Sequence, residues 1–282
     1  MSGYSGGDVI TSRKNPYLLK IASLQDRKYR EEYALFSIEG KKLVLEAISA
    51  GIYPDEIIFS EEKFDVLFPL IDSAYALAGM KLPSIIRCSR ECFAKISAEK
   101  APEGIIAVAK HLDFFKKSIK IDGRQIDSLF SRDERMLVLY DIRDPGNMGA
   151  VMRSALAFGI ERIVLGGSCV DLYNPKTVRA SMGAVFRLQY AFASDLSFYA
   201  DSLRAVGRRL LAAELKDGAR PLQSVGVNAR DVFVIGNEGH GIPPEVSSLC
   251  DASVYIPIAP MSESLNASVA ASILLWEQSR SF

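Results

Sequence analysis

Short apolar runs alternate with amphipathic stretches along most of the 282-residue chain. Apolar runs that are rich in β-branched residues and end at glycine or polar positions predict buried strands. Apolar positions at three- and four-residue spacing predict helices. From Met136 onward the two patterns alternate regularly, which predicts a mostly parallel sheet covered by helices on both faces. The sequence therefore indicates an α/β fold.

The N-terminal part predicts a smaller α/β module of its own. We expect its strands at Leu35–Ile38, Glu56–Ser60, Ser84–Cys88 and Gly104–Lys110, and its helices at Gly40–Ala50, Phe64–Ala78 and Arg90–Ile96. The following charged stretch has little apolar periodicity and reads as a linker, with some helix over Leu112–Ile119. We accordingly divide the chain into a first domain (1–110), a linker (111–134) and a second domain (135–282).

The second domain predicts six strands and three helices. We expect the strands at Met136–Ile142, Arg162–Leu165, Phe186–Ala191, Arg209–Glu214, Val232–Ile235 and Val254–Pro257. The helices are expected at Gly149–Phe158, after a turn, at Phe198–Val206, and after residue 261, where Ser262 or Ser264 is able to cap the helix. Glycines and prolines in GNEGHGIPP (Gly236–Pro244) predict a turn directly after a buried strand.

Five polar residues fall at or beside the predicted helix starts and loops of this domain: Asn147, Arg153, Glu238, Ser264 and Asn266. In the plainer interpretation Glu238 is a solvated loop residue, and Ser264 and Asn266 are helix caps. Apolar neighbours predict that Arg153 lies half buried against Glu238, either as a structural ion pair or as a guanidinium aimed at a phosphate. The residues alone leave both interpretations open.

Several common sites are excluded by the sequence. Neither glycine loop matches the dinucleotide fingerprint or the phosphate-binding loop. Two histidines do not support a Ser–His–Asp set, and no cluster of carboxylates, cysteines and histidines indicates a metal site. The four cysteines are expected to be free thiols in a reducing compartment. With no signal peptide and no run of eighteen apolar residues, we expect a cytoplasmic protein without a membrane segment.

Charge gives a mixed indication of nucleic-acid binding. Lys+Arg and Asp+Glu both number 34, so the formal net charge is zero, which is weak evidence against such binding. The stretch Thr11–Tyr33, however, combines an apolar helix face with many basic residues. That pattern indicates either a solvated helix face or contact with phosphates.

Three motifs in the second domain resemble those of the SpoU/TrmH family of RNA ribose methyltransferases, in the knotted SPOUT superfamily. DPGNMGAVMRSALAFG (Asp144–Gly159) is similar to the first motif, IGNEGHGI (Ile235–Ile242) to the second, and IPIAPMSESLNASVAASILLWE (Ile256–Glu277) to the third. The first domain, through FSIEGKKLVLEA, resembles the family's ribosomal-protein-like substrate-binding domain. The two-domain form is similar to the 23S ribosomal RNA enzymes more than to the single-domain tRNA enzymes.

The resemblance implies a trefoil knot, a homodimer and S-adenosyl-L-methionine as methyl donor for a ribose 2′-hydroxyl in RNA. It implies catalytic roles for Asn147, Arg153, Glu238, Ser264 and Asn266, and cofactor contacts for Gly236, Gly239, Ile256 and Leu265. It also implies that the first domain binds RNA, for which we expect Arg13, Lys14, Arg27 and Lys28 to contact phosphates. The alternatives are a tRNA 2′-O-methyltransferase and a non-catalytic RNA-binding protein that retains the fold.

Overall fold

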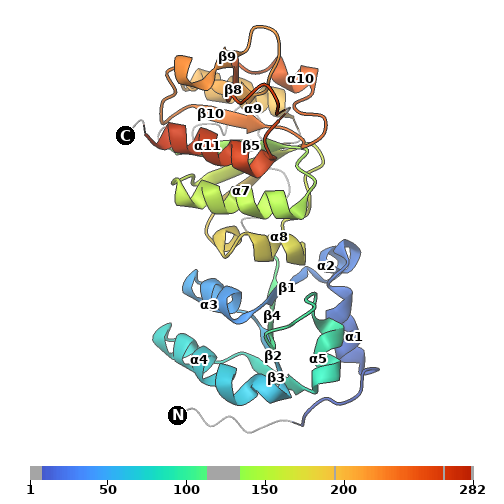
Figure 1. Ribbon diagram of the computed structural model, residues 1–282. Helices are drawn as coiled ribbons and strands as arrows, with labels where there is room; N and C mark the ends of the chain where they lie inside the picture. The colour runs from blue at the N-terminus through green and yellow to red at the C-terminus, as the bar shows by residue number, and fades with distance from the viewer. Residues whose placement is uncertain (1–7, 113–133, 194, 263, 281–282) are drawn as a thin grey trace. The chain divides into compact units, whose positions relative to one another are not determined.

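The computed structural model describes residues 8–112, 134–193, 195–262 and 264–280 (Figure 1). The chain forms two compact units. The first comprises Met1–His111 together with Tyr173–Phe186, and the second comprises Leu112–Leu172 and Arg187–Phe282. The division expected from the sequence, at residues 111–134, did not predict that Tyr173–Phe186 groups with the first unit. Most of the expected linker, with its helix, lies outside the described residues.

The first unit is built on a four-stranded sheet with the order β1-β4-β2-β3. β4 is antiparallel to β1 and β2, whereas β2 and β3 are parallel. The strands are β1 (Leu35–Glu39), β2 (Glu56–Ser60), β3 (Ser84–Cys88) and β4 (Ile105–Lys110). The predicted strands are thereby confirmed, those of β2 and β3 to the residue.

Helices cover both faces of this sheet. Figure 1 shows α1 and α5 on one face and α3 and α4 on the other. The helices of the unit are α1 (Pro16–Ser23), α2 (Arg27–Tyr33), α3 (Lys41–Ser49), α4 (Phe64–Leu77), α5 (Arg90–Ile96) and α8 (Pro175–Ala180). The basic stretch forms two helices rather than one, because Asp26 caps a new helix by accepting a hydrogen bond from the Lys28 N–H.

The second unit contains a seven-stranded sheet with the order β7-β6-β5-β10-β8-β11-β9. All of its pairings are parallel. The strands are β5 (Met136–Tyr140), β6 (Arg162–Gly166), β7 (Gln189–Ala193), β8 (Leu210–Ala213), β9 (Arg220–Pro221), β10 (Val232–Ile235) and β11 (Ala252–Tyr255). Apolar side chains fill β5 and β10 almost completely, as expected for strands buried on both faces.

Helices flank this sheet as well, and Figure 1 shows α7 and α11 together on one face. The helices of this unit are α7 (Pro145–Ala157), α9 (Leu196–Ala205), α10 (Pro244–Ser247) and α11 (Ala267–Ser279). On the other face, side chains of α9 and α10 pack on β5 and β10 through residues such as Tyr199, Leu203 and Val246. The prediction of a parallel sheet covered on both faces is confirmed.

Several predicted features of this unit differ from the structure: β9 was not predicted, and β11 begins two residues before the expected Val254–Pro257. Three other differences have identifiable physical reasons. α7 begins at Pro145 instead of Gly149, because Asp144 caps it and proline is tolerated in the first helical turn. The strand expected at Phe186–Ala191 begins at Gln189, after a short 3-10 turn at Ala184–Phe186. The cap of α11 is Asn266, whose side chain accepts from the Ser268 N–H at 2.9 Å, so neither Ser262 nor Ser264 caps it.

The cysteines are free thiols, as predicted. Burial raises the pKa of Cys88 and of Cys250 to about 12 and that of Cys169 to about 11, so these three thiols stay protonated at neutral pH. Among the helices that the structure describes, none has the length and apolar character needed to cross a bilayer.

A buried carboxylate, that of Asp231, lies immediately before β10, at the N-terminal ends of the strands of the second sheet. Asp231 is 1% exposed and accepts from Arg209 Nε at 2.8 Å, from the Asn228 N–H at 2.9 Å and from Asn228 Nδ2 at 3.0 Å. We expect Asp231→Ala to lower the free energy of unfolding by about 3 kcal/mol, because it leaves these donors without their acceptor. Urea denaturation measures the change.

The matched control is Asp201→Ala, since Asp201 pairs with Arg204 at 3.0 Å while its own side chain is 77% exposed. Removing this surface pair is expected to cost about 0.5 kcal/mol or less. Equal losses for the two variants would contradict the importance assigned to the buried carboxylate.

Candidate functional site

The side-chain amide of Asn147 joins three segments that are distant in the sequence. Its Nδ2 donates to Glu238 Oε1 at 3.0 Å, and its Oδ1 accepts from Asn266 Nδ2 at 2.9 Å. Asn147 lies in the first turn of α7, Glu238 in the loop after β10, and Asn266 at the cap of α11. Three of the five predicted catalytic residues are therefore brought into one hydrogen-bonded chain.

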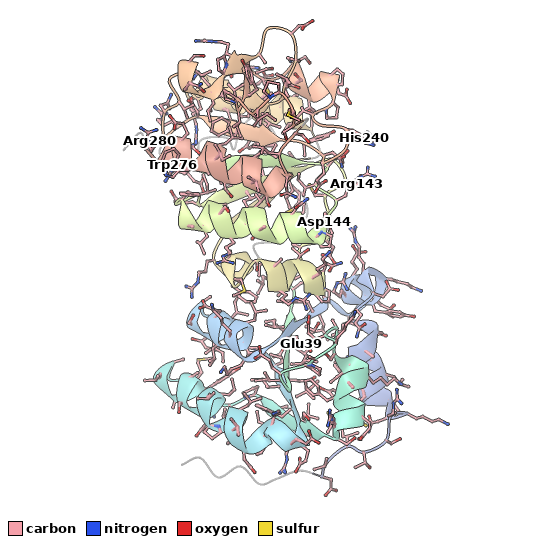
Figure 2. The ribbon with its side chains drawn as sticks, viewed as in Figure 1. Glu39, Arg143, Asp144, His240, Trp276 and Arg280 are labelled. Atoms are coloured by element: carbon pink, nitrogen blue, oxygen red, sulfur yellow. The ribbon has the colours of Figure 1, made fainter. Side chains whose placement is uncertain are left out.

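The carboxylate of Glu238 lies over the N-terminus of α7. Its two oxygens accept from the backbone N–H groups of Arg143 and Asp144, each at 3.4 Å, in addition to the bond from Asn147. An anion is favoured at this end of a helix, where N–H groups lack partners within the helix. Figure 2 shows Arg143, Asp144 and His240 at the same edge of the second unit. The interpretation of Glu238 as a merely solvated residue is wrong.

The loop that carries Glu238 is fixed by its own backbone and by Asn237. Asn237 and Gly241 exchange two backbone hydrogen bonds of 2.9 Å. The Asn237 side chain donates to the Asp141 carbonyl at 2.8 Å and accepts from the N–H groups of Gly239 and His240. A Cβ at Gly236 would lie 2.4 Å from the backbone of Gly241, so this close approach requires glycine. Asn237 was missed as a site residue, although its place inside GNEGHG could have indicated it.

A cavity of about 470 Å³ opens beside this chain of hydrogen bonds. The ends of β8 and β11 and the first turns of α11 line it, including Ile256, Ser264 and Leu265. Ser264 and Leu265 immediately precede Asn266, so one short segment lines the cavity and also supplies the Asn266 side chain that binds Asn147. We call the hydrogen-bonded chain Glu238–Asn147–Asn266 the Asn147 bridge. Of the predicted cofactor contacts, Ile256 and Leu265 line the cavity, whereas Gly236 and Gly239 are not part of its lining.

Glu214 is a lining residue that the sequence analysis missed. Its Oε1 accepts from the hydroxyls of Ser247 and Ser253, at 2.5 and 2.7 Å, and lies 2.7 Å from Lys216 Nζ. Burial raises the pKa of this carboxyl, but the hydrogen bonds from Lys216, Ser247 and Ser253 together hold it below its ordinary value. Glu214 thereby ties the end of β8 to α10 and β11, which fixes one wall of the cavity.

Arg153 is exposed on α7. The expectation that it lies half buried against Glu238 is wrong, because that carboxylate is bonded instead to Asn147 and to the N–H groups of Arg143 and Asp144 before the helix. Within the described part of the chain, Arg153 has no hydrogen bond or ion pair, so its guanidinium is available to a ligand. Ser264 is also exposed, and its carbonyl accepts from the Ser262 hydroxyl at 3.3 Å.

The four residues expected to contact RNA lie at the start of the first unit, and all are exposed. Arg27 forms an ion pair with Glu31 at 2.8 Å, and Lys28 lies over the ring of Tyr29 at 5.4 Å. Arg13 and Lys14 precede α1. In the ranges that the structure covers, no group of three or more histidine, cysteine or acidic side chains is arranged to hold a metal ion.

Known proteins of similar sequence include RNA methyltransferases. The chain is 28% identical over 268 residues to the 23S rRNA (guanosine(2553)-2'-O)-methyltransferase RlmP of Bacillus subtilis (strain 168), with 95% of this chain and 97% of that protein covered. It is 27% identical to rRNA methyltransferase 3, mitochondrial, of Homo sapiens, with 91% and 70% covered.

Solved structures show the same architecture. A crystal structure of an RNA 2'-O ribose methyltransferase matches with a TM-score of 0.79 and 30% identity, covering 97% of this chain and 99% of that one. The AdoMet-bound rRNA methyltransferase from Sinorhizobium meliloti matches with a TM-score of 0.80 and 27% identity, covering 97% of each chain.

Two family models divide the chain between them. Residues 15–107 match an MRM3-like substrate binding domain. Residues 134–276, about half of the chain, match the model of the SpoU rRNA Methylase family, and the protein belongs to that family.

Proposed function

We propose that this protein transfers a methyl group from S-adenosyl-L-methionine to a ribose 2′-hydroxyl of 23S ribosomal RNA. The observation that carries the proposal is the Asn147 bridge, which joins all three motif segments beside a cavity that one of them lines. The RlmP relative of Bacillus subtilis, which matches along nearly its whole length, is named for the same reaction on 23S rRNA. That length of match favours ribosomal RNA over tRNA.

The cavity suits the methyl donor. Its lining is largely apolar, with Ile256, Leu265 and Leu274 among its side chains, and the described residues that line it include neither lysine nor arginine. A cationic sulfonium group would therefore meet no like charge from these residues. S-adenosyl-L-methionine supplies a methyl group on positively charged sulfur, which departs as a neutral thioether. We propose that Ile256 and Leu265 contact the cofactor and that Gly236 and Gly239 act by shaping the neighbouring loop.

The protein's part in catalysis is to place the ribose and to manage its proton. A 2′-hydroxyl is a poor nucleophile until its proton is being removed. Arg153, which is exposed and has no partner among the described residues, would bind an RNA phosphate and hold it beside the hydroxyl as the proton acceptor, since a guanidinium itself stays protonated. Asn147, Glu238 and Asn266 would keep the start of α7 fixed relative to the cavity, and the Ser264 hydroxyl would face the ribose.

A non-catalytic protein that retained the fold would not need this arrangement. It would be free to lose Arg153 or the Asn147 bridge, and both are present. We further propose that the family's trefoil knot forms around the cavity and that the protein acts in the cytoplasm. The RNA is recognised by the first domain, 1–110, with Arg13, Lys14, Arg27 and Lys28 on phosphates.

We propose a homodimer as well, because α11 exposes large apolar side chains. Trp276 is 50% exposed and Val269 is 47% exposed. Figure 2 shows Trp276 and Arg280 at the end of α11 opposite to Arg143 and Asp144. Exposed apolar surface on an otherwise well-packed helix is typical of a protein–protein contact.

Arg153→Ala tests the catalytic proposal. We expect 2′-O-methylation of 23S rRNA to fall by about 100-fold or more, because the phosphate that takes the proton is no longer held. Binding of S-adenosyl-L-methionine, measured by calorimetry, should stay at the wild-type level. Arg220→Ala, which removes an exposed arginine of β9, is the control and should keep full activity. Undiminished methylation by Arg153→Ala would remove this residue from the mechanism.

Gly236→Ala tests the link between loop and cofactor cavity. The new Cβ would overlap the backbone of Gly241, so the loop must shift, and we expect cofactor affinity to fall by about tenfold or more, a change of about 1.4 kcal/mol. Gly226→Ala, at a glycine whose Cβ would meet nothing within 4 Å, controls for general loss of stability. Equal cofactor affinities for the two variants would show that the conformation of this loop does not affect cofactor binding in the cavity.

Trp276→Glu tests the dimer. Sedimentation equilibrium should show a dimer for the wild type and a monomer for this variant, since a charge would be buried in the contact. The control is Leu77→Glu, at a 90% exposed position of the first unit, which should leave the mass unchanged. A monomeric wild type would refute the proposed homodimer.

A further inference from the structure

The first unit contains a second cavity, of about 510 Å³, whose lining differs from that of the cofactor cavity. It lies where β2 and β3 end, between the start of α4, the start of α5 and the segment that leads into β4. Its residues include Ser60, Lys63, Arg90, Lys100 and Gly104. The cavity is thus surrounded by cationic side chains from three separate segments.

These three cations are exposed, and within the structure's coverage Lys63, Arg90 and Lys100 have neither a hydrogen bond nor an ion pair. Among the described residues of the lining, Glu62 is the one carboxylate. The cavity therefore has an excess of positive charge that its own lining does not neutralise, although the chain as a whole has no net charge.

The neighbouring carboxylates are engaged elsewhere. Glu61 pairs with Arg87, and Glu99 pairs with Arg179. Glu103 accepts from the Lys41 N–H at 2.8 Å. Glu91 is bonded to its own N–H and to the Ser89 hydroxyl, which lower the pKa of its carboxyl, with a smaller contribution from the charge of Arg90. None of these four described carboxylates lines the cavity.

The shape of the cavity is built into the backbone. Gly104 has a φ of +93°, and a Cβ there would lie 2.6 Å from Lys63 Cγ, so the stem of Lys63 occupies space that any other residue would need. The Gly104 carbonyl accepts from the Ser60 N–H at 2.9 Å, which holds the two segments together. Phe93, 1% exposed, packs in the core beneath. A buried ring cannot stack on a base, so the site offers charge rather than base recognition.

We propose that this cavity binds the phosphate backbone of the RNA substrate through Lys63, Arg90 and Lys100. The inference rests on the proposed function, because it assigns a binding surface within the substrate-binding domain. The arginine fork fits phosphate oxygens in pairs, and lysines act as mobile point charges on the rim. The contact would be independent of sequence and would position the RNA rather than select the base.

The test is the salt dependence of binding to 23S ribosomal RNA by the full-length protein. The double variant Lys63→Gln/Lys100→Gln should bind more weakly and lower the slope of log K against log[salt] by about 0.7 to 0.9 for each phosphate that is no longer neutralised. Adding Arg90→Gln to the double variant should lower the slope further, again by about 0.7 to 0.9 for each additional phosphate that is no longer neutralised. Calorimetric binding of S-adenosyl-L-methionine should not change in either variant.

The matched control is Lys81→Gln/Lys110→Gln, which removes two exposed lysines from the opposite edge of the same sheet. Its salt slope should stay close to the wild-type value. If both double variants give the same slope, the cavity does not bind RNA. If calorimetry with inorganic phosphate alone detects the removal of Lys63 and Lys100 while the RNA slope is unchanged, the cavity is a small-anion site and the proposal is refuted.

Failure of the proposed function would look different. The wild type could bind 23S rRNA with a salt slope that depends on Lys63, Arg90 and Lys100 and yet transfer no methyl group. That result would refute the methyltransferase proposal and leave the cavity assignment standing. If the wild type and the variant that lacks Lys63, Arg90 and Lys100 methylate 23S rRNA equally well at every salt concentration, the cavity assignment alone is refuted.

Discussion

The relative placement of the three motif segments depends on a single side-chain amide. Asn147 uses both ends of its amide group, donating to Glu238 and accepting from Asn266, so neither end can rotate without losing a partner. A parallel sheet brings the carboxyl ends of its strands to one edge, but it does not fix the loops that follow them. The amide supplies that constraint, because it connects the start of α7, the loop after β10 and the cap of α11.

The electrostatics of this edge follow from the same bond. Glu238 accepts from the N–H groups of Arg143 and Asp144, immediately before α7, at the end of the helix that favours an anion. Satisfied in this way, the carboxylate does not need Arg153 as a partner. Without a partner among the described residues, the exposed Arg153 guanidinium can bind a phosphate through its planar set of N–H groups. The helix start therefore stabilises Glu238 and at the same time leaves Arg153 available.

Most strands could be predicted from the sequence, although β9 was missed and β11 was placed two residues too late. The site geometry could be predicted only in part. β2, β3 and β10 have the predicted bounds because short β-branched runs between glycine and polar residues are typical of strands. The start of α7 was misplaced, since proline and glycine suggest a turn until the capping carboxylate of Asp144 is considered. At α11 several residues were able to cap, and the bond from Asn266 to Asn147, a tertiary contact, agrees with the cap observed.

Other features were out of reach of any local pattern. Glu214 has a local partner in Lys216, but its hydroxyl partners come from α10 and β11, far along the chain, so AELKDG alone does not identify Glu214 as part of a cavity wall. The two cavities make the same point about charge. Among the described residues, the lining of one is free of lysine and arginine, which suits a sulfonium, and the other is surrounded by three exposed cations, which suits a polyanion. A net charge of zero is compatible with both, because binding depends on charges that lie within a Debye length of the ligand and not on their sum over the chain.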